Sequence, residues 1–247
     1  MELPASDAMT LLRLRNLTKS YGALVVTQDF SLDVEQGDLV GILGPNGAGK
    51  TTLFNQITGT VLPDKGEVWF DGRDVTRVAA SERCRLGIAR SFQVPHPFVG
   101  MTVYENILVG ATFGRGAGDP RQRALDVLNR TGMADKANTL AGALTLLDRK
   151  RLEMARALAA DPKLLLLDEI AGGLTDSECI SLLDTIRQVH ATGVTIIWIE
   201  HVVHALMAVA KRLVVVDFGR KVTEGDPATV MASSEVKSIY MGEDALD

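Results

Sequence analysis

The sequence predicts an α/β protein in which a mainly parallel sheet follows antiparallel strands and is interrupted by a helical insertion. Several apolar runs have the length of buried strands: DLVGIL, KLLLLDE, VTIIWIE and RLVVVDF. In the last third these runs alternate with helical patterns, which favours parallel pairing because a parallel connection needs a crossover. An early segment alternates apolar and polar residues, and the middle of the chain has the spacing of helices.

The first third is expected to be mostly strand. In FSLDVEQG three apolar side chains alternate with polar ones, which indicates a half-buried strand that ends at Gly37. DLVGIL leads into a glycine-rich loop and then a helix, KTTLFNQITG, for which Gly59 is the expected C-terminal stop. EVWFDGRDV predicts a hairpin with Asp71 and Gly72 in its turn.

The middle and last thirds carry helix-start signals. Thr102 and Glu105 have the spacing of a capping box, and so do Thr175 and Glu178. A glycine-rich loop ends in Asp119-Pro120, which begins another helix.

These signals predict how the chain is divided. We expect one domain over residues 1–247, with a core from 10–93 and 161–247 and a helical subdomain over 94–160.

Composition excludes some classes of protein. The 247 residues carry a formal net charge of -5, which argues against a general nucleic-acid binder because such proteins present a basic face. The first residues lack the basic and apolar pattern of a signal peptide, so none is expected there. The apolar runs are far shorter than the roughly 20 residues of a membrane span. If the protein works at a membrane, a partner would hold it there. The two cysteines lack metal-site spacing and are expected to be reduced thiols.

The segment GPNGAGKT, which begins at Gly44, fits the pattern G-x-x-x-x-G-K-[ST] between a predicted strand and a predicted helix. Glycines let backbone N–H groups turn toward phosphate oxygens, and the helix N-terminus favours an anion. Lys50 would reach the β- and γ-phosphates of ATP, and the Thr51 hydroxyl would bind Mg²⁺. The predicted nucleotide-binding loop consists of Gly44, Pro45, Asn46, Gly47, Ala48, Gly49, Lys50, Thr51 and Thr52, and the fold predicted around it is a P-loop NTPase core.

LLLLDE supplies the second half of this site. Four apolar residues bury a strand, and Asp168 follows at its C-terminal end, where open α/β sheets bind their ligands. Asp168 would hold the Mg²⁺ shell, and Glu169 would polarise the attacking water. An acidic pair after a strand is by itself a common helix start, so the prediction depends on the accompanying loop.

Together these motifs resemble the ATP-binding cassette (ABC) family, and the resemblance covers nearly the whole chain. Tyr21 matches the aromatic residue that stacks on adenine in that family. Gln93 matches the Q-loop glutamine, which senses Mg²⁺ and links to the membrane partner, and His201 matches the histidine that contacts the γ-phosphate. The resemblance implies ATP and Mg²⁺ as cofactors, Glu169, His201 and Gln93 as catalytic residues, and Thr51, Gln93 and Asp168 around the metal.

Finer matches suggest a subfamily. SFQVPHPFVGMTVYENILVGA and the C-terminal tail look like ATPase subunits of branched-chain amino-acid uptake systems, and AGGLTDSE leans partly toward urea and short-amide importers. The resemblance implies a peripheral protein on the cytoplasmic face of the membrane, with a second ATPase subunit, a permease, an indirect solute-binding protein and no nucleic acid. A lipid-export ATPase remains an alternative. A non-transport ATPase or a non-catalytic scaffold fits less well.

One motif departs from the family. Where ABC proteins carry the signature LSGGQ, which closes over the nucleotide of the opposite subunit, this chain has Leu144, Thr145, Leu146, Leu147 and Asp148. Leu146 and Leu147 add bulk where the backbone should approach phosphate, and a close approach there would favour positive φ. Asp148 is expected to cap the following helix, and its charge would repel a phosphate about 4 Å away by roughly 4 kcal/mol unless it is neutralised.

The altered motif predicts an asymmetric heterodimer. This chain's own half-site is intact and would hydrolyse ATP with the partner's signature, whereas the site facing LTLLD would be weak. The plainer alternative is that the leucines pack against the helical subdomain and that the dimer adjusts its closure.

Overall fold

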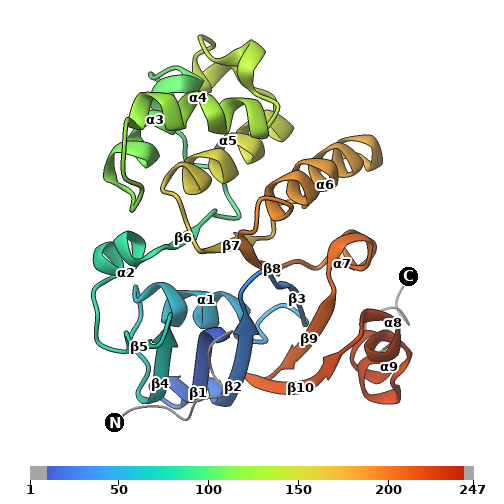
Figure 1. Ribbon diagram of the computed structural model, residues 1–247. Helices are drawn as coiled ribbons and strands as arrows, with labels where there is room; N and C mark the ends of the chain where they lie inside the picture. The colour runs from blue at the N-terminus through green and yellow to red at the C-terminus, as the bar shows by residue number, and fades with distance from the viewer. Residues whose placement is uncertain (1–9, 242–247) are drawn as a thin grey trace.

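The computed structural model describes residues 10–241, which form two sheets and a helical lobe (Figure 1). The smaller sheet is antiparallel with the order β2-β1-β4-β5, and the larger has the order β10-β9-β3-β8-β7-β6. In the larger sheet every pairing is parallel except that of β9 with β10. The predicted fold class is confirmed. The ten strands described are β1 (Thr10–Tyr21), β2 (Leu24–Glu35), β3 (Leu39–Leu43), β4 (Lys65–Phe70), β5 (Arg73–Asp74), β6 (Ile88–Arg90), β7 (Leu164–Asp168), β8 (Thr195–Ile199), β9 (Arg212–Asp217) and β10 (Arg220–Gly225).

The helices cover the larger sheet and build the lobe. In Figure 1 the lobe of α3, α4 and α5 stands above the sheets, with α6 beside it. The larger helices are α1 (Lys50–Thr58), α2 (Ala80–Leu86), α3 (Val103–Phe113), α4 (Pro120–Arg130), α5 (Leu146–Ala159), α6 (Asp176–His190), α7 (Val203–Val209), α8 (Pro227–Ala232) and α9 (Ser234–Met241), with short 3-10 turns at Ala134–Lys136 and Ala141–Ala143. No helix within residues 10–241 is both long and apolar enough to cross a membrane.

The buried strands divide their side chains between two cores. In β7, Leu165 and Leu167 face the core shared with the lobe, whereas Leu164 and Leu166 face the core beneath the antiparallel sheet. The other parallel strands β3, β8 and β9 alternate in the same way. The continuous apolar runs of the sequence therefore reflect strands that are covered on both faces.

The local signals predicted from the sequence form as expected. Both capping boxes are complete, at Thr102 before α3 and at Thr175 before α6. Asp119 caps α4, with Pro120 as its first residue, and Gly59 ends α1 in the left-handed conformation. The division of the chain at residues 94 and 160 stays a prediction, and the helices α3 to α5 lie within it.

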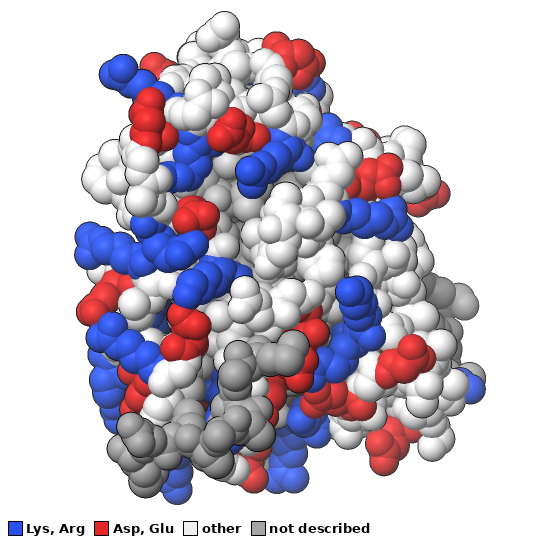
Figure 2. Space-filling view, viewed as in Figure 1, with Lys and Arg blue, Asp and Glu red and all other residues white. Residues whose placement is uncertain are grey.

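Lysine and arginine side chains are interspersed with acidic ones on the face viewed in Figure 2.

Both cysteines, Cys84 and Cys179, are free thiols, and burial raises the pKa of each.

Candidate nucleotide-binding and catalytic site

The loop between β3 and α1 is shaped by glycines at close approaches. Gly49 has φ 96°, and a Cβ atom there would lie 2.1 Å from the backbone oxygen of Val26. A Cβ atom on Gly44 would lie 2.1 Å from the backbone oxygen of Val216. The loop is thus wedged between β2 and β9, which fixes where α1 begins.

Lys50 is buried in the first turn of α1 and is folded back onto the loop. Its Nζ donates to the backbone oxygens of Gly44 at 2.6 Å and Pro45 at 2.9 Å. No side chain caps the N-terminus of α1, so its backbone N–H groups face the adjoining cavity, and Thr51 there is exposed. A cation, a helix N-terminus without a side-chain cap and a glycine-rich backbone together fit the phosphates of a nucleotide.

Two adjoining cavities share this loop. One of about 400 Å³ is lined by Leu24 and Val26, the loop, Gln93 and Glu169. The other, of about 510 Å³, is lined by the start of the loop, Gln93, Glu169, His201 and Tyr240. Because both contain Gln93 and Glu169, these two residues lie where the cavities meet.

Asp168 is held at the end of β7 by a basic residue that the sequence did not indicate. Arg90, at the end of β6, donates to Asp168 Oδ2 at 2.5 Å and to Asn55 Oδ1 at 2.6 Å. Its guanidinium lies 5.4 Å from the ring centre of Phe54 and 5.2 Å from that of Phe92. Arg90 therefore orients the carboxylate predicted to hold Mg²⁺.

The donor set is suited to Mg²⁺ only when a nucleotide is present. Within residues 10–241, no three His, Cys, Asp or Glu side chains gather as a metal site. Thr51 and Gln93 line the first cavity, whereas Asp168 is buried at the end of β7 and lines neither cavity. All three carry oxygen atoms of the kind that Mg²⁺ prefers, and phosphate oxygens would complete such a set. In that position Mg²⁺ would neutralise charge on the phosphates.

Glu169 is the group around which the predicted catalytic residues gather. Gln93 Nε2 donates to Glu169 Oε2 at 2.5 Å, and His201 Nδ1 lies 3.7 Å from the same oxygen. The His201 side chain is 53% exposed, whereas that of Glu169 is 13% exposed. A shielded carboxylate beside an accessible imidazole is an arrangement that can take a proton from water and then stabilise the charge that develops.

Tyr21 lies outside both cavities. It ends β1, is half exposed, and Lys19 Nζ is 5.5 Å from its ring centre. The apolar side chains that line the cavity are Leu24 and Val26 of the adjoining strand β2. Adenine stacking on Tyr21 stays a prediction.

The structure corrects the prediction for Asp148. The residue that caps α5 is Thr145, and the helix begins at Leu146, so Asp148 lies in the first turn. Asp148 is 4% exposed; its Oδ2 accepts from Lys136 Nζ at 2.5 Å and from the Thr145 hydroxyl at 2.8 Å. The charge that was expected to repel a phosphate is therefore already neutralised.

The two leucines of the turn differ from each other. Leu146 is 44% exposed, and Leu147 packs half-buried against the core shared with the lobe. Both are helical, and neither has the positive φ considered from the sequence. The packing of Leu147 agrees with the plainer explanation, whereas exposed Leu146 still presents bulk at the start of α5.

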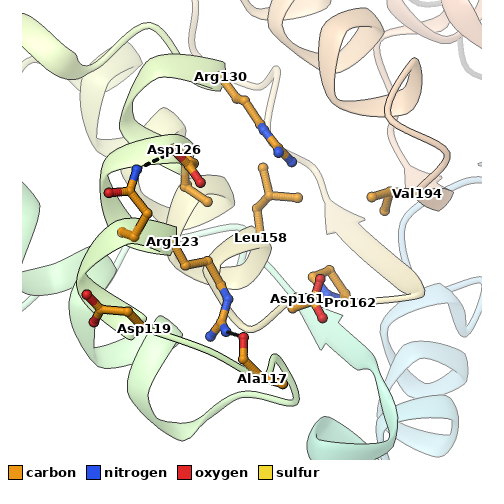
Figure 3. A pocket seen from close by; sticks show the side chains of 11 residues that line it. Ala117, Asp119, Arg123, Asp126, Arg130, Leu158, Asp161, Pro162 and Val194 are labelled. Carbon is orange, nitrogen blue, oxygen red and sulfur yellow. Dashed lines mark hydrogen bonds between the residues drawn. The ribbon is translucent and has the colours of Figure 1, made fainter.

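A separate cavity of about 340 Å³ lies on the other side of the lobe (Figure 3). It is lined by α4, by Leu158 of α5 and by the segment Asp161–Pro162 ahead of β7, and Arg123 of α4 donates to the backbone oxygen of Ala117 in the loop before that helix. None of the predicted site residues lines it.

Comparison with known proteins agrees with this geometry. A family model described as ABC transporter matches residues 27–172. The lipopolysaccharide export system ATP-binding protein LptB of Acidithiobacillus ferridurans is 33% identical, over 94% of this chain and 97% of its own length. The high-affinity branched-chain amino acid transport ATP-binding protein LivG of Salmonella typhimurium is 32% identical, over 94% of this chain and 98% of its own length.

A solved ATP-binding cassette of an ABC transporter, in its ADP conformation, has a TM-score of 0.87 and 30% identity, covering 95% of this chain and 99% of its own. ATPase domains of this family dimerise and work with a transmembrane permease. The chain therefore belongs to the ABC transporter family, as an ATPase domain that binds ATP with Mg²⁺ and hydrolyses it.

Proposed function

We propose that the chain is the ATPase subunit of an importer for branched-chain or other small hydrophobic amino acids. In this proposal it lies on the cytoplasmic face of the membrane, pairs with a different ATPase subunit and a permease, and depends indirectly on a solute-binding protein. The observation that carries the ATPase role is the convergence of Gln93 and His201 on Glu169 beside the Lys50 loop. The likeness to LivG and to branched-chain uptake subunits supports the solute class.

In the proposed reaction Glu169 accepts the proton of the attacking water. Lys50 and the N-terminus of α1 bind the phosphates, which stabilises the charge of the transition state. His201, which lines the second cavity, would donate to the γ-phosphate, and Gln93, which bonds Glu169, would be a ligand of Mg²⁺. Asp168, whose carboxylate Arg90 orients, would hold Mg²⁺, which would neutralise charge on the phosphates.

The proposed asymmetry now depends on the shape of the signature turn rather than on its charge. The Thr145 hydroxyl is used in capping α5, where it accepts from the Asp148 N–H and donates to the Asp148 carboxylate. A Cβ atom on Gly173 would lie 3.4 Å from the Leu146 side chain. Leu146 therefore also reduces the space in which a nucleotide could approach the loop before α6. These features support a weak second site, which would leave one working site per dimer.

A mostly apolar cavity of about 400 Å³ between the core and the lobe supports coupling to a permease. Phe92, Phe98 and Phe113 line it and are exposed, and Phe92 follows Arg90 on the segment that leads to Gln93. A permease segment seated there would contact Arg90, which orients Asp168.

The second candidate is a lipopolysaccharide exporter, which the 33% identity to LptB favours. A urea or short-amide importer is a third, on the likeness of AGGLTDSE. The two named relatives differ by one percentage point in identity, so identity does not separate export from import.

Transport in the native host tests the solute. Deleting the gene is expected to abolish high-affinity uptake of radiolabelled leucine, isoleucine and valine, and the native chain supplied in trans should restore it. The Glu169→Gln chain is the matched control and should not restore it. Unchanged amino-acid uptake with loss of lipopolysaccharide from the outer membrane would overturn the importer in favour of export, and loss of urea uptake alone would favour the third candidate.

ATPase activity of the purified chain tests the asymmetry. We expect almost no turnover from the native chain and at least about tenfold more from Leu146→Gly/Leu147→Gly, because glycines allow the close approach of backbone to phosphate. Asp148 is kept in this variant since it pairs with Lys136. Leu146→Ala/Leu147→Ala is the control, as it removes bulk and keeps Cβ atoms. Strong activity of the native chain alone would rule out the asymmetric dimer, and so would a co-expressed pair that stops only when the partner's P-loop lysine is changed.

A further inference from the structure

The backbone after β7 is held in an unusual conformation at Glu169. Glu169 has φ 46°, in the left-handed region that side-chain-bearing residues seldom adopt. Its N–H donates to the backbone oxygen of Ile199 at 2.8 Å, which anchors one end of the residue to β8. A conformation of this kind persists only where the surroundings fix it, and such residues cluster at functional sites.

A buried lysine holds the other end of the same residue. Lys150, in the second turn of α5, is 4% exposed, and its Nζ donates to the backbone oxygen of Glu169 at 3.3 Å. Burial lowers the pKa of Lys150, while Glu200 and Glu169 act in the opposite direction, which indicates that both carboxylates are close. Lys150 is therefore a buried side chain packed against the backbone of Glu169.

A buried glutamate, Glu200, bonds the backbone of two segments: the one that follows Glu169 after β7 and the one that carries His201 after β8. Glu200 is 0% exposed, and its Oε2 accepts from the Ala171 N–H at 2.9 Å. Its Oε1 accepts from the N–H groups of His201 at 3.0 Å and Val202 at 3.3 Å. One carboxylate thus ties the segment after Glu169 to the segment that carries His201.

We propose that Lys150 and Glu200 are positioning residues that clamp the backbone around Glu169 and His201 and link it to the signature helix α5. The proposal goes beyond the site residues assigned above and rests on Glu169 being the catalytic base. Neither side chain lines the two nucleotide cavities. Lys150 contacts the backbone of Glu169. Glu200 contacts the backbone N–H of His201 and also its ring, whose Nδ1 lies 3.3 Å from Glu200 Oε1.

Through α5, the contact of Lys150 with Glu169 links this chain's catalytic site to the turn that faces the partner's nucleotide. Lys150 lies four residues after Leu146, about 6 Å along the helix from the turn that faces the opposite subunit. A shift of α5 when the dimer closes would move Lys150 and with it the carbonyl of Glu169. A displacement of about 1 Å at a catalytic group can cost about 100-fold in rate, so a small shift would be enough to switch hydrolysis.

Steady-state ATPase kinetics of the assembled transporter test the clamp. Lys150→Met is expected to lower kcat about tenfold or more with KM within about twofold, because the loss is one of positioning. Lys150→Arg, which keeps a buried donor, should recover much of the rate. Arg151→Met is the matched control: it removes the same charge from the next residue of α5, whose guanidinium bonds Ser181 in α6. Arg151→Met should lower the free energy of unfolding while kcat stays close to the native value.

Glu200→Gln is the second variant tested in the same kinetic experiment. It keeps one acceptor oxygen and the volume of the side chain, and its effect combined with Lys150→Met should be smaller than the product of the two single effects, because both residues act on one loop. If Glu169→Gln retains full turnover, the assignment of the catalytic base fails. If Glu169→Gln is inactive while Lys150→Met behaves like Arg151→Met, only the clamp is overturned.

Discussion

Glu169→Gln is expected to lower kcat of the assembled transporter at least about 100-fold while leaving ATP affinity within about twofold. The amide keeps the size of the side chain and can still contact Gln93 and His201, but it cannot take a proton from water. The measurement is steady-state phosphate release beside equilibrium binding of a fluorescent ATP analogue.

The matched control for this experiment is Glu178→Gln. Glu178 lies in the capping box of α6, where an amide oxygen can still accept from the Thr175 N–H. Its kcat should stay within about twofold of the native value, because the change lies outside the catalytic cavities. A Glu169→Gln protein that kept more than about a tenth of native turnover would show that another group serves as the base.

Arg83→Met is expected to lower the free energy of unfolding by about 3 kcal/mol or more. Arg83 is fully buried in α2, and burial lowers the pKa of its guanidinium to about 10. It donates to four backbone oxygens, and methionine would leave these carbonyls without their donors. They belong to Gln56 at 2.7 Å, Ile57 at 2.9 Å, Thr76 at 3.0 Å and Val78 at 3.0 Å.

Urea unfolding checks this expectation, with Arg85→Met as the control. Arg85 lies two residues away on the same helix and is exposed, so its replacement should change the unfolding free energy by less than about 0.5 kcal/mol. Equal shifts in the two variants would mean that the buried hydrogen bonds contribute little. Because Gln56 and Ile57 lie in the last turn of α1, loss of Arg83 should also weaken ATP binding.

Local signals in the sequence predicted most of the fold and pointed to the residues of the candidate site. The P-loop, both capping boxes and the strand before Asp168 depend on short-range spacing, so the neighbouring residues specify them. The cap of α5 was placed wrongly because both Thr145 and Asp148 are good capping residues. In the structure Thr145 is the cap, and its hydroxyl accepts from the Asp148 N–H three residues on.

The long-range partners of the site could not be predicted in the same way. Arg90 is 78 residues from Asp168, and Lys150 and Glu200 are ordinary charged residues in the sequence. Tyr240 reaches the second cavity from α9 near the end of the described chain. Only the folded arrangement brings these side chains together, since no periodicity or spacing connects them.

The core shared by the lobe and the sheet determines how the protein can move. Val103, Ile107 and Leu152 of the lobe belong to the same buried cluster as Leu165 of β7 and Leu182 of α6. A lobe that swung open on a hinge would expose this apolar surface to water, whereas helices that slide past one another keep it covered. The lobe is thus expected to respond to ATP by shear, in small steps between alternative packings, and to unfold together with the sheet as one cooperative unit.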